Sequence, residues 1–130
     1  MRCAWPSRAV GAVLGCDLGP CFRRRIPELY TGPDGKPGDL TKMIGEDWDA
    51  VVFNGYVSQY KFAPIRVEPD ERVRVWVLDA GPNENSSFHI VGTNFDTVFK
   101  EGTLLLEPDA RRGGSQALDL QPAQGGYVEF

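Results

Sequence analysis

The sequence contains one histidine, His89, and three cysteines, and these are the side chains best suited to binding a transition metal. Cys3, Cys16 and Cys21 all lie at the start of the chain, far from His89 in sequence. Their number is odd and their spacing matches no zinc pattern, so a disulfide and a free thiol both stay open for them. His89 has two interpretations. It binds a metal together with ligands from another domain or subunit, or it is a core or loop histidine held by a backbone hydrogen bond.

The remaining polar side chains form no recognisable catalytic motif. The sequence shows no Ser-His-Asp order, no phosphate-binding glycine loop and no paired-carboxylate motif. Met43 has the chemistry of a weak axial copper ligand, but no cysteine or histidine lies near it in the sequence. Asp49, Asp79, Asp96 and Glu107 fall at or near the ends of expected strands, where carboxylates are usually solvated. No catalytic residue is therefore predicted.

The elements that must position these residues are short strands. In Arg72–Asp79, Val73, Val75 and Val77 point to one side while charged and larger residues alternate with them. Burying each valine contributes about 1.5–3 kcal/mol, so the pattern predicts that these three residues face a core.

Seven further strands are predicted, separated by turn-forming residues. A loop over Tyr30–Asp39 and a single helical turn at Leu40–Met43 precede them. Eight short strands without long helices predict an all-β fold, an antiparallel Greek-key β-sandwich. The other predicted strands are Asp49–Phe53, Ala63–Glu68, Ser86–Val91, Phe95–Phe99, Thr103–Glu107, Ala117–Leu120 and Gly126–Phe130.

Length and charge narrow the function classes. At 130 residues the chain has room for one domain. Its formal charge is −4 and it has no basic stripe with interleaved aromatics, so nucleic acid is not an expected partner. No apolar run reaches the roughly 20 residues of a membrane-spanning helix.

The first 29 residues are predicted to be a leader of uncertain structure. The apolar run Ala9–Leu14 is shorter than the roughly 7–15 residues of a signal-peptide core, and Cys21 and three arginines follow it closely, so no convincing signal peptide is present. We expect residues 1 to about 25 to pack poorly against the sandwich, because they lack an apolar periodicity. The folded domain is placed at residues 30–130.

Five phrases, taken together, resemble the second cupredoxin, or plastocyanin-like, domain of multicopper oxidases and copper-containing nitrite reductases. They extend in order over about a hundred residues. The phrases are Tyr-Thr-Gly-Pro-Asp-Gly at Tyr30–Gly35, Val-Val-Phe-Asn-Gly-Tyr at Val51–Tyr56, Arg-Val-Arg-Val-Trp-Val-Leu at Arg72–Leu78, Phe-His-Ile-Val-Gly-Thr-Asn-Phe-Asp at Phe88–Asp96 and Gly-Gly-Ser-Gln-Ala-Leu at Gly113–Leu118.

The resemblance implies a cupredoxin-like sandwich that is incomplete at both ends. It also implies copper-dependent electron transfer to oxygen or nitrite, a copper-bearing cupredoxin domain or subunit as partner, a homotrimer in some relatives, and a periplasmic or secreted location. The expected ligands are missing here. Against the oxidase motif, His89 matches while Val91 and Thr93 replace histidines; against the nitrite reductase motif, His89 matches the first histidine and Asn94 replaces the active-site one.

This chain alone is therefore predicted to hold no copper, and His89 is its one candidate metal ligand, in concert with another chain or domain. The leading hypothesis is a partial or degenerate cupredoxin domain of a copper oxidoreductase. The alternative is a structural or binding β-sandwich without a metal.

Overall fold

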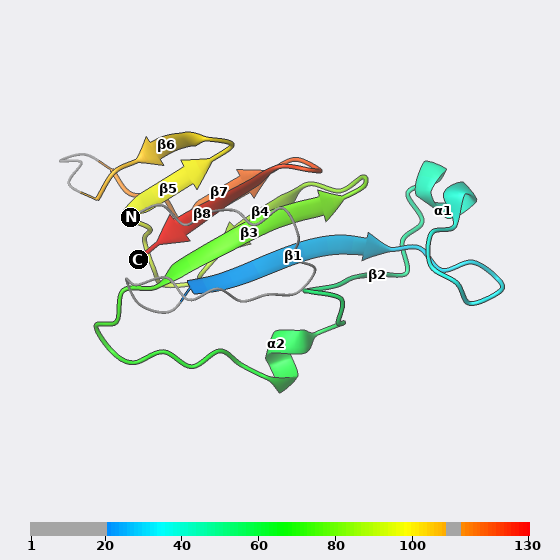
Figure 1. Ribbon diagram of the computed structural model, residues 1–130, viewed down its shortest axis with the longest axis horizontal. Helices are drawn as coiled ribbons and strands as arrows, with labels where there is room; N and C mark the ends of the chain where they lie inside the picture. The colour runs from blue at the N-terminus through cyan, green and yellow to red at the C-terminus, as the bar shows by residue number, and fades with distance from the viewer. Residues whose placement is uncertain (1–20, 109–112) are drawn as a thin grey trace.

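The computed structural model describes residues 21–108 and 113–130, and their side chains from residue 28 onward. Two β-sheets face each other and two very short helices lie in loops (Figure 1). The prediction of a β-sandwich is confirmed. The strands are β1 (Cys21–Leu29), β2 (Ala50–Val51), β3 (Arg74–Gly81), β4 (Ser86–His89), β5 (Thr97–Lys100), β6 (Thr103–Leu106), β7 (Ala117–Leu120) and β8 (Gly125–Glu129); the helices are α1 (Leu40–Ile44) and α2 (Gln59–Phe62).

The larger sheet has six strands in the order β2-β1-β3-β8-β5-β6, and the smaller sheet contains β4 and β7. All the pairs are antiparallel except β1 with β3, which run parallel. In the larger sheet, β8 lies between β3 and β5. Glu129 of β8 therefore has two neighbours: Arg74 on the β3 side and Thr97 on the β5 side.

The core lies between the two sheets. Val73, Val75 and Val77 are 3%, 4% and 3% exposed, so the prediction that they face the core is confirmed. They pack with buried residues of both sheets, and a one-residue slip of β3 would bury arginine in their place. The other buried members of the cluster are Phe95, Val98, Leu118, Leu120 and Val128.

The chain before residue 30 differs from the expectation. β1 begins at Cys21 and pairs with β3 from Cys21 opposite Arg74 to Pro27 opposite Gly81. The expectation of poor packing is therefore wrong for residues 21–25, while residues 1–20 lie outside the described residues. Sequence periodicity missed β1 because Arg23, Arg24 and Arg25 form a charged run with no alternation.

The predicted strand Ala63–Glu68 is also wrong: these residues form no strand in the structure and all are exposed. Their sequence alternates as a strand should, but no neighbouring strand pairs with them. The predicted helical turn at Leu40–Met43 is confirmed within α1, whose first turn is capped by the Asp39 side chain accepting from the Lys42 N–H at 2.9 Å.

A hydrogen-bonded junction joins α1 to the far end of β3. The Glu28 carboxylate accepts from the Tyr30 hydroxyl and from the Asn83 backbone N–H at 3.1 Å. The Asn83 side chain in turn donates to the Tyr30 hydroxyl at 2.9 Å and to the Met43 carbonyl at 2.8 Å. Tyr30 is 1% exposed, and its burial, with the Glu28 hydrogen bond, raises its pKa above the ordinary value. These contacts fix the loop that leads from β3 into β4.

Candidate functional site

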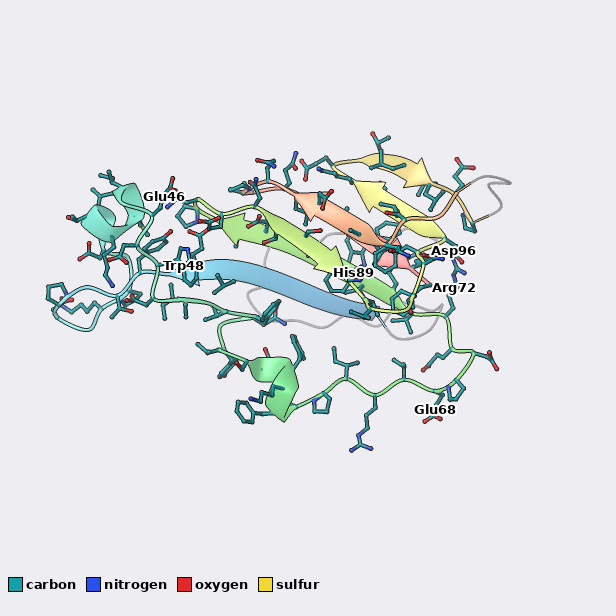
Figure 2. All side chains as sticks on the ribbon, turned by 180° about the vertical axis from the view of Figure 1, so that it is seen from behind. Glu46, Trp48, Glu68, Arg72, His89 and Asp96 are labelled. Atoms are coloured by element: carbon teal, nitrogen blue, oxygen red, sulfur yellow. The ribbon has the colours of Figure 1, made fainter. Side chains whose placement is uncertain are left out.

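His89 is the last residue of β4, at the end of the smaller sheet, and its side chain is exposed (Figure 2). It lies opposite Ala117 of β7, and its Nδ1 contacts the backbone carbonyl of Gln116. A carbonyl can only accept, so Nδ1 carries a proton, and in the neutral ring Nε2 holds the lone pair. Metal-binding histidines are commonly oriented in this way, with one ring nitrogen donating to a carbonyl. The same hydrogen bond also fits a histidine that is simply held in a loop.

The positions beside His89 carry no second ligand. Val91 is 89% exposed, Thr93 is half-buried and Asn94 is exposed. A Cβ added to Gly114 would lie 3.6 Å from the Asn94 Cβ, which places Asn94 against the loop before β7. Within residues 21–108 and 113–130, no group of three or more His, Cys, Asp or Glu side chains could hold a metal ion. The described residues therefore do not fit a copper centre by themselves.

The structure separates Met43 from His89. Met43 belongs to α1, which stands at one end of the molecule, while His89 lies toward the opposite end, near Arg72 and Asp96 (Figures 1 and 2). Met43 and His89 are therefore not brought together as ligands of one metal.

The four carboxylates at predicted strand ends have different surroundings. Glu107 is exposed, as expected. Asp49 accepts from the Thr31 N–H at 2.5 Å and from the Lys42 ammonium, and the hydrogen bond from Lys42, followed by that from Thr31, lowers its pKa. Asp79 is 1% exposed, so the expectation of a solvated carboxylate is wrong there. Its Oδ1 accepts from the Gly81 N–H at 2.9 Å, while Oδ2 has no hydrogen-bond partner among the described residues.

An ion-pair network lies at the start of β3. Arg72 binds Asp96 through two parallel hydrogen bonds of 2.9 and 2.8 Å and reaches Glu129 Oε2 at 2.8 Å. Arg74 donates to the other Glu129 oxygen through Nε at 2.5 Å, and its guanidinium lies 4.6 Å from the centre of the Tyr127 ring. The network joins three neighbouring strands of the larger sheet.

The network changes the proton affinity of its members. Hydrogen bonds to Asp96 and then Glu129 raise the pKa of Arg72. Burial alone would raise the pKa of Glu129, but the hydrogen bonds from Arg72 and Arg74 outweigh burial and lower it below the ordinary value. The balance at Asp96 is the same: burial opposes Arg72 and Thr97, and the pKa falls. Arg72, Asp96 and Glu129 therefore stay charged at neutral pH, and together with Arg74 they form a structural clamp.

Backbone contacts connect this clamp to the histidine. Phe95 and Ser115 exchange backbone hydrogen bonds of 2.6 and 3.2 Å. Phe95 precedes Asp96 of the clamp, and Ser115 precedes Gln116, whose carbonyl contacts His89. We call this region, residues 89–96 with 115–116 and Arg72, the His89 end of the sandwich. Sequence reasoning identified His89 but missed the clamp. The alternation of Arg72 and Arg74 with the core valines was the available signal.

A shallow cleft of about 390 Å³ lies between β5, β6 and β7, and it shares Ser115 with the His89 end. Its lining is mainly aliphatic, with Lys100 spanning to the smaller sheet through a 2.7 Å hydrogen bond from Nζ to the Asp119 carbonyl. The cleft contains no histidine or cysteine, so it offers no metal chemistry.

Comparison with curated proteins finds copper-containing nitrite reductases. The relative from Neisseria meningitidis serogroup A is 35% identical over 92 residues, which are 66% of this chain and 24% of that protein. The relative from Neisseria gonorrhoeae is 34% identical over the same length and shares. The chain thus spans about a quarter of the length of the curated relatives it matches. No family model matches the sequence.

Solved structures give the same result. The chain superposes on the copper nitrite reductase of Nitrosomonas europaea with a TM-score of 0.62 and 28% identity, covering 83% of this chain and 38% of that one. The copper-containing nitrite reductase of Thermus scotoductus gives a TM-score of 0.68 at 24% identity, covering 85% and 23% of the two chains. A multicopper oxidase gives 0.62 at 21% identity, covering 85% and 33%. The last two comparisons bear on the fold alone.

No helix among the described residues is long and apolar enough to span a membrane. The sequence phrases, the two-sheet fold and the curated relatives agree with one another. The chain is therefore a relative of copper-containing nitrite reductases over 92 residues, and the fold of its described residues is that of a partial cupredoxin domain.

Proposed function

We propose that this chain provides a second cupredoxin sandwich for a copper oxidoreductase and packs against a copper-bearing cupredoxin domain or subunit through the His89 end. The chemistry of the assembly is electron transfer through copper to oxygen or nitrite. The chain's own contribution is to complete the fold of the assembly and to present one imidazole to a shared centre.

The observation that carries this proposal is the state of His89. Its ring is exposed, its Nδ1 is held by the Gln116 carbonyl, and Nε2 is left to face a partner. Val91, 89% exposed beside it, gives the same surface an apolar residue suited to burial in an interface. The clamp of Arg72, Asp96 and Glu129 keeps the neighbouring strand ends in register, so the imidazole stands on a rigid support.

Copper, when bound, supplies the redox change in this class of protein. A blue copper site needs a thiolate and two imidazoles, and a centre that binds oxygen or nitrite needs several imidazoles. One chain provides His89 as its one imidazole, and its sandwich contains one described cysteine, Cys21, which lies in β1 opposite Arg74 of β3. The other ligands must come from the partner, and this requirement makes the proposed function dependent on assembly.

The proposal includes the arrangement implied by family resemblance. It divides the chain into residues 1–29 and a cupredoxin-like domain at residues 30–130, and β1 extends the described sheet back to Cys21. A homotrimer would bring three copies of His89 into one assembly, and an extracytoplasmic location would suit copper loading.

Co-expression with a copper-loaded blue-copper domain of a related enzyme tests the proposal. We expect a complex of defined mass whose electron paramagnetic resonance spectrum contains a second copper signal in addition to the blue one. His89→Ala should remove the second signal and leave the complex intact, whereas the neighbouring exposed Asn94→Ala should retain both. A chain that stays a metal-free monomer beside that domain would reject the proposal and favour a binding sandwich without a metal.

A further inference from the structure

The turn between β2 and α2 carries an asparagine directly before a glycine. Phe53 and Tyr56 close this turn with two backbone hydrogen bonds of 3.0 and 3.1 Å. Asn54 and Gly55 form its tip, and their φ angles are positive, at 52° and 91°. Asparagine and glycine adopt this conformation at low cost, so the fold favours this pair at the tip of a tight turn. The same pair is also chemically reactive.

An asparagine side chain that precedes glycine reacts with its own backbone. The Gly55 backbone nitrogen attacks Cγ of Asn54, the new C–N bond closes a five-membered succinimide, and the bond from Cγ to Nδ2 breaks. The Gly55 amide proton leaves with Nδ2 as ammonia, and water then opens the ring to an aspartyl or isoaspartyl residue. Asn54 is exposed to water, and a Cβ built on Gly55 would meet nothing within 4 Å, so the turn has room for the ring.

Tyr60 of α2 restrains the reacting side chain. Its hydroxyl oxygen accepts from Nδ2 of Asn54 at 2.8 Å. The Tyr60 ring packs edge-on against Phe53, the residue before Asn54, with the ring centres 6.1 Å apart. Ring closure needs the carboxamide to turn so that Cγ faces the Gly55 nitrogen. The hydrogen bond to Tyr60 opposes this rotation, because the nitrogen that it holds is the one that must leave.

We propose that Asn54 is a deamidation site of this chain and that the hydrogen bond to Tyr60 slows its reaction. One hydrogen bond shifts an equilibrium by roughly two- to tenfold, so the loss of this bond should speed deamidation by about that factor. The reaction adds a negative charge at the tip of the turn. Its isoaspartyl product also lengthens the backbone between β2 and α2.

Incubation of the full chain in mildly alkaline buffer, followed by peptide mass mapping over time, tests the proposal. Tyr60→Phe keeps the ring that packs against Phe53 and removes the hydroxyl. Deamidation at Asn54 should be roughly two- to tenfold faster in this variant than in wild type. Asn85 is the internal control, because it is also exposed but precedes Ser86, and its slower rate should be the same in both chains.

An equal or slower rate at Asn54 in Tyr60→Phe would overturn the role of the hydrogen bond. The same acceleration at Asn85 would also overturn it, because this result would indicate a general loosening of the fold.

Unfolding in urea separates the reactivity of the sequence from the effect of the fold. In urea, wild type and Tyr60→Phe should react at equal rates at Asn54, because Tyr60 no longer holds the side chain. Gly55→Ala should react more slowly than both, since its methyl group crowds the attacking nitrogen, and strain at the positive φ plays no part in the unfolded chain. An unfolded wild type in which Asn54 reacts no faster than Asn85 would overturn the site itself.

Discussion

Glu129→Gln removes the shared carboxylate of the clamp while keeping its shape. The side chain of Glu129 is 9% exposed and bonds Arg72 at 2.8 Å and Arg74 at 2.5 Å. Hydrogen bonds to charged groups contribute about 1.5–3 kcal/mol each, and breaking a fully buried ion pair costs about 3–5 kcal/mol. In the variant, Arg72 still pairs with Asp96 and Arg74 still packs against the Tyr127 ring. The loss of stability should therefore lie near the lower of these values. We expect the free energy of unfolding to fall by about 2–3 kcal/mol.

Urea unfolding followed by tryptophan fluorescence and circular dichroism measures this change. For a domain of about 100 residues, 1 kcal/mol shifts the melting temperature by roughly 4–8 °C, so the loss should also be plain in a thermal scan. Asp96→Asn is the matched control. Its carboxylate also pairs with Arg72 but is 42% exposed, so the expected cost is below about 1 kcal/mol. Equal costs for the two variants would refute the reasoning that burial decides the strength of the clamp.

The pH dependence gives a second test. The pKa of Glu129 is lower in the folded chain than in the unfolded one, so the unfolded state takes up its proton first as the pH falls. The stabilisation is complete above the ordinary glutamate pKa and is lost as the pH falls through the depressed folded value. The stability difference between wild type and Glu129→Gln should therefore be largest near neutral pH and shrink in acid. A difference that grows below pH about 4 would contradict the sign of this linkage.

Three further substitutions or additions test other parts of the structure. Gly126→Ala should destabilise the fold by about 1–3 kcal/mol or more, because the added Cβ would lie 2.2 Å from the Phe99 carbonyl oxygen. In the control Gly125→Ala the added Cβ would lie 3.3 Å from the Val77 carbonyl oxygen, so the same urea titration should show a smaller cost. Asn83→Ala should cost about 1–3 kcal/mol, since it leaves the buried Tyr30 hydroxyl without a donor and the Met43 carbonyl with backbone donors alone. Faster amide exchange in α1 should accompany it. The purified chain, loaded with Cu(II) and desalted, should retain no stoichiometric copper and show no intense thiolate-to-copper absorption band, because no cysteine lies near His89 in sequence. One tightly held copper with such a band would mean that Cys3, Cys16 or Cys21 reaches His89.

The residues that sequence alone places correctly are those whose burial follows a local period. Val73, Val75 and Val77 alternate with charged residues, and the alternation alone identifies their buried face. β7 was predicted with its observed bounds, Ala117–Leu120, because a glycine-rich loop and Pro122 frame it. Local pattern and tertiary structure agree at these positions.

The predictions from sequence fail where strand pairing depends on a strand that is distant in the sequence. Ile65 and Val67 alternate as well as the valines of β3 do, but a strand also needs a neighbour, and the described fold offers them none. β1 shows the reverse case, since a charged run becomes a strand through its parallel pairing with β3. In the same way, the clamp joins residues 24 and 57 positions apart, and no spacing rule connects Arg72 to Asp96 and Glu129.

The place of β8 between β3 and β5 has a consequence for synthesis. β8 is the last described strand to leave the ribosome, yet both of these earlier strands hydrogen-bond to it. Until residues 125–129 emerge, the valines of β3 have no completed sheet to join, and loop closure must span 55 residues between Arg74 and Glu129. From the synthesis of β3 until that of β8, the nascent chain therefore carries an apolar strand without one of its two neighbours, and chaperones bind such exposed strands.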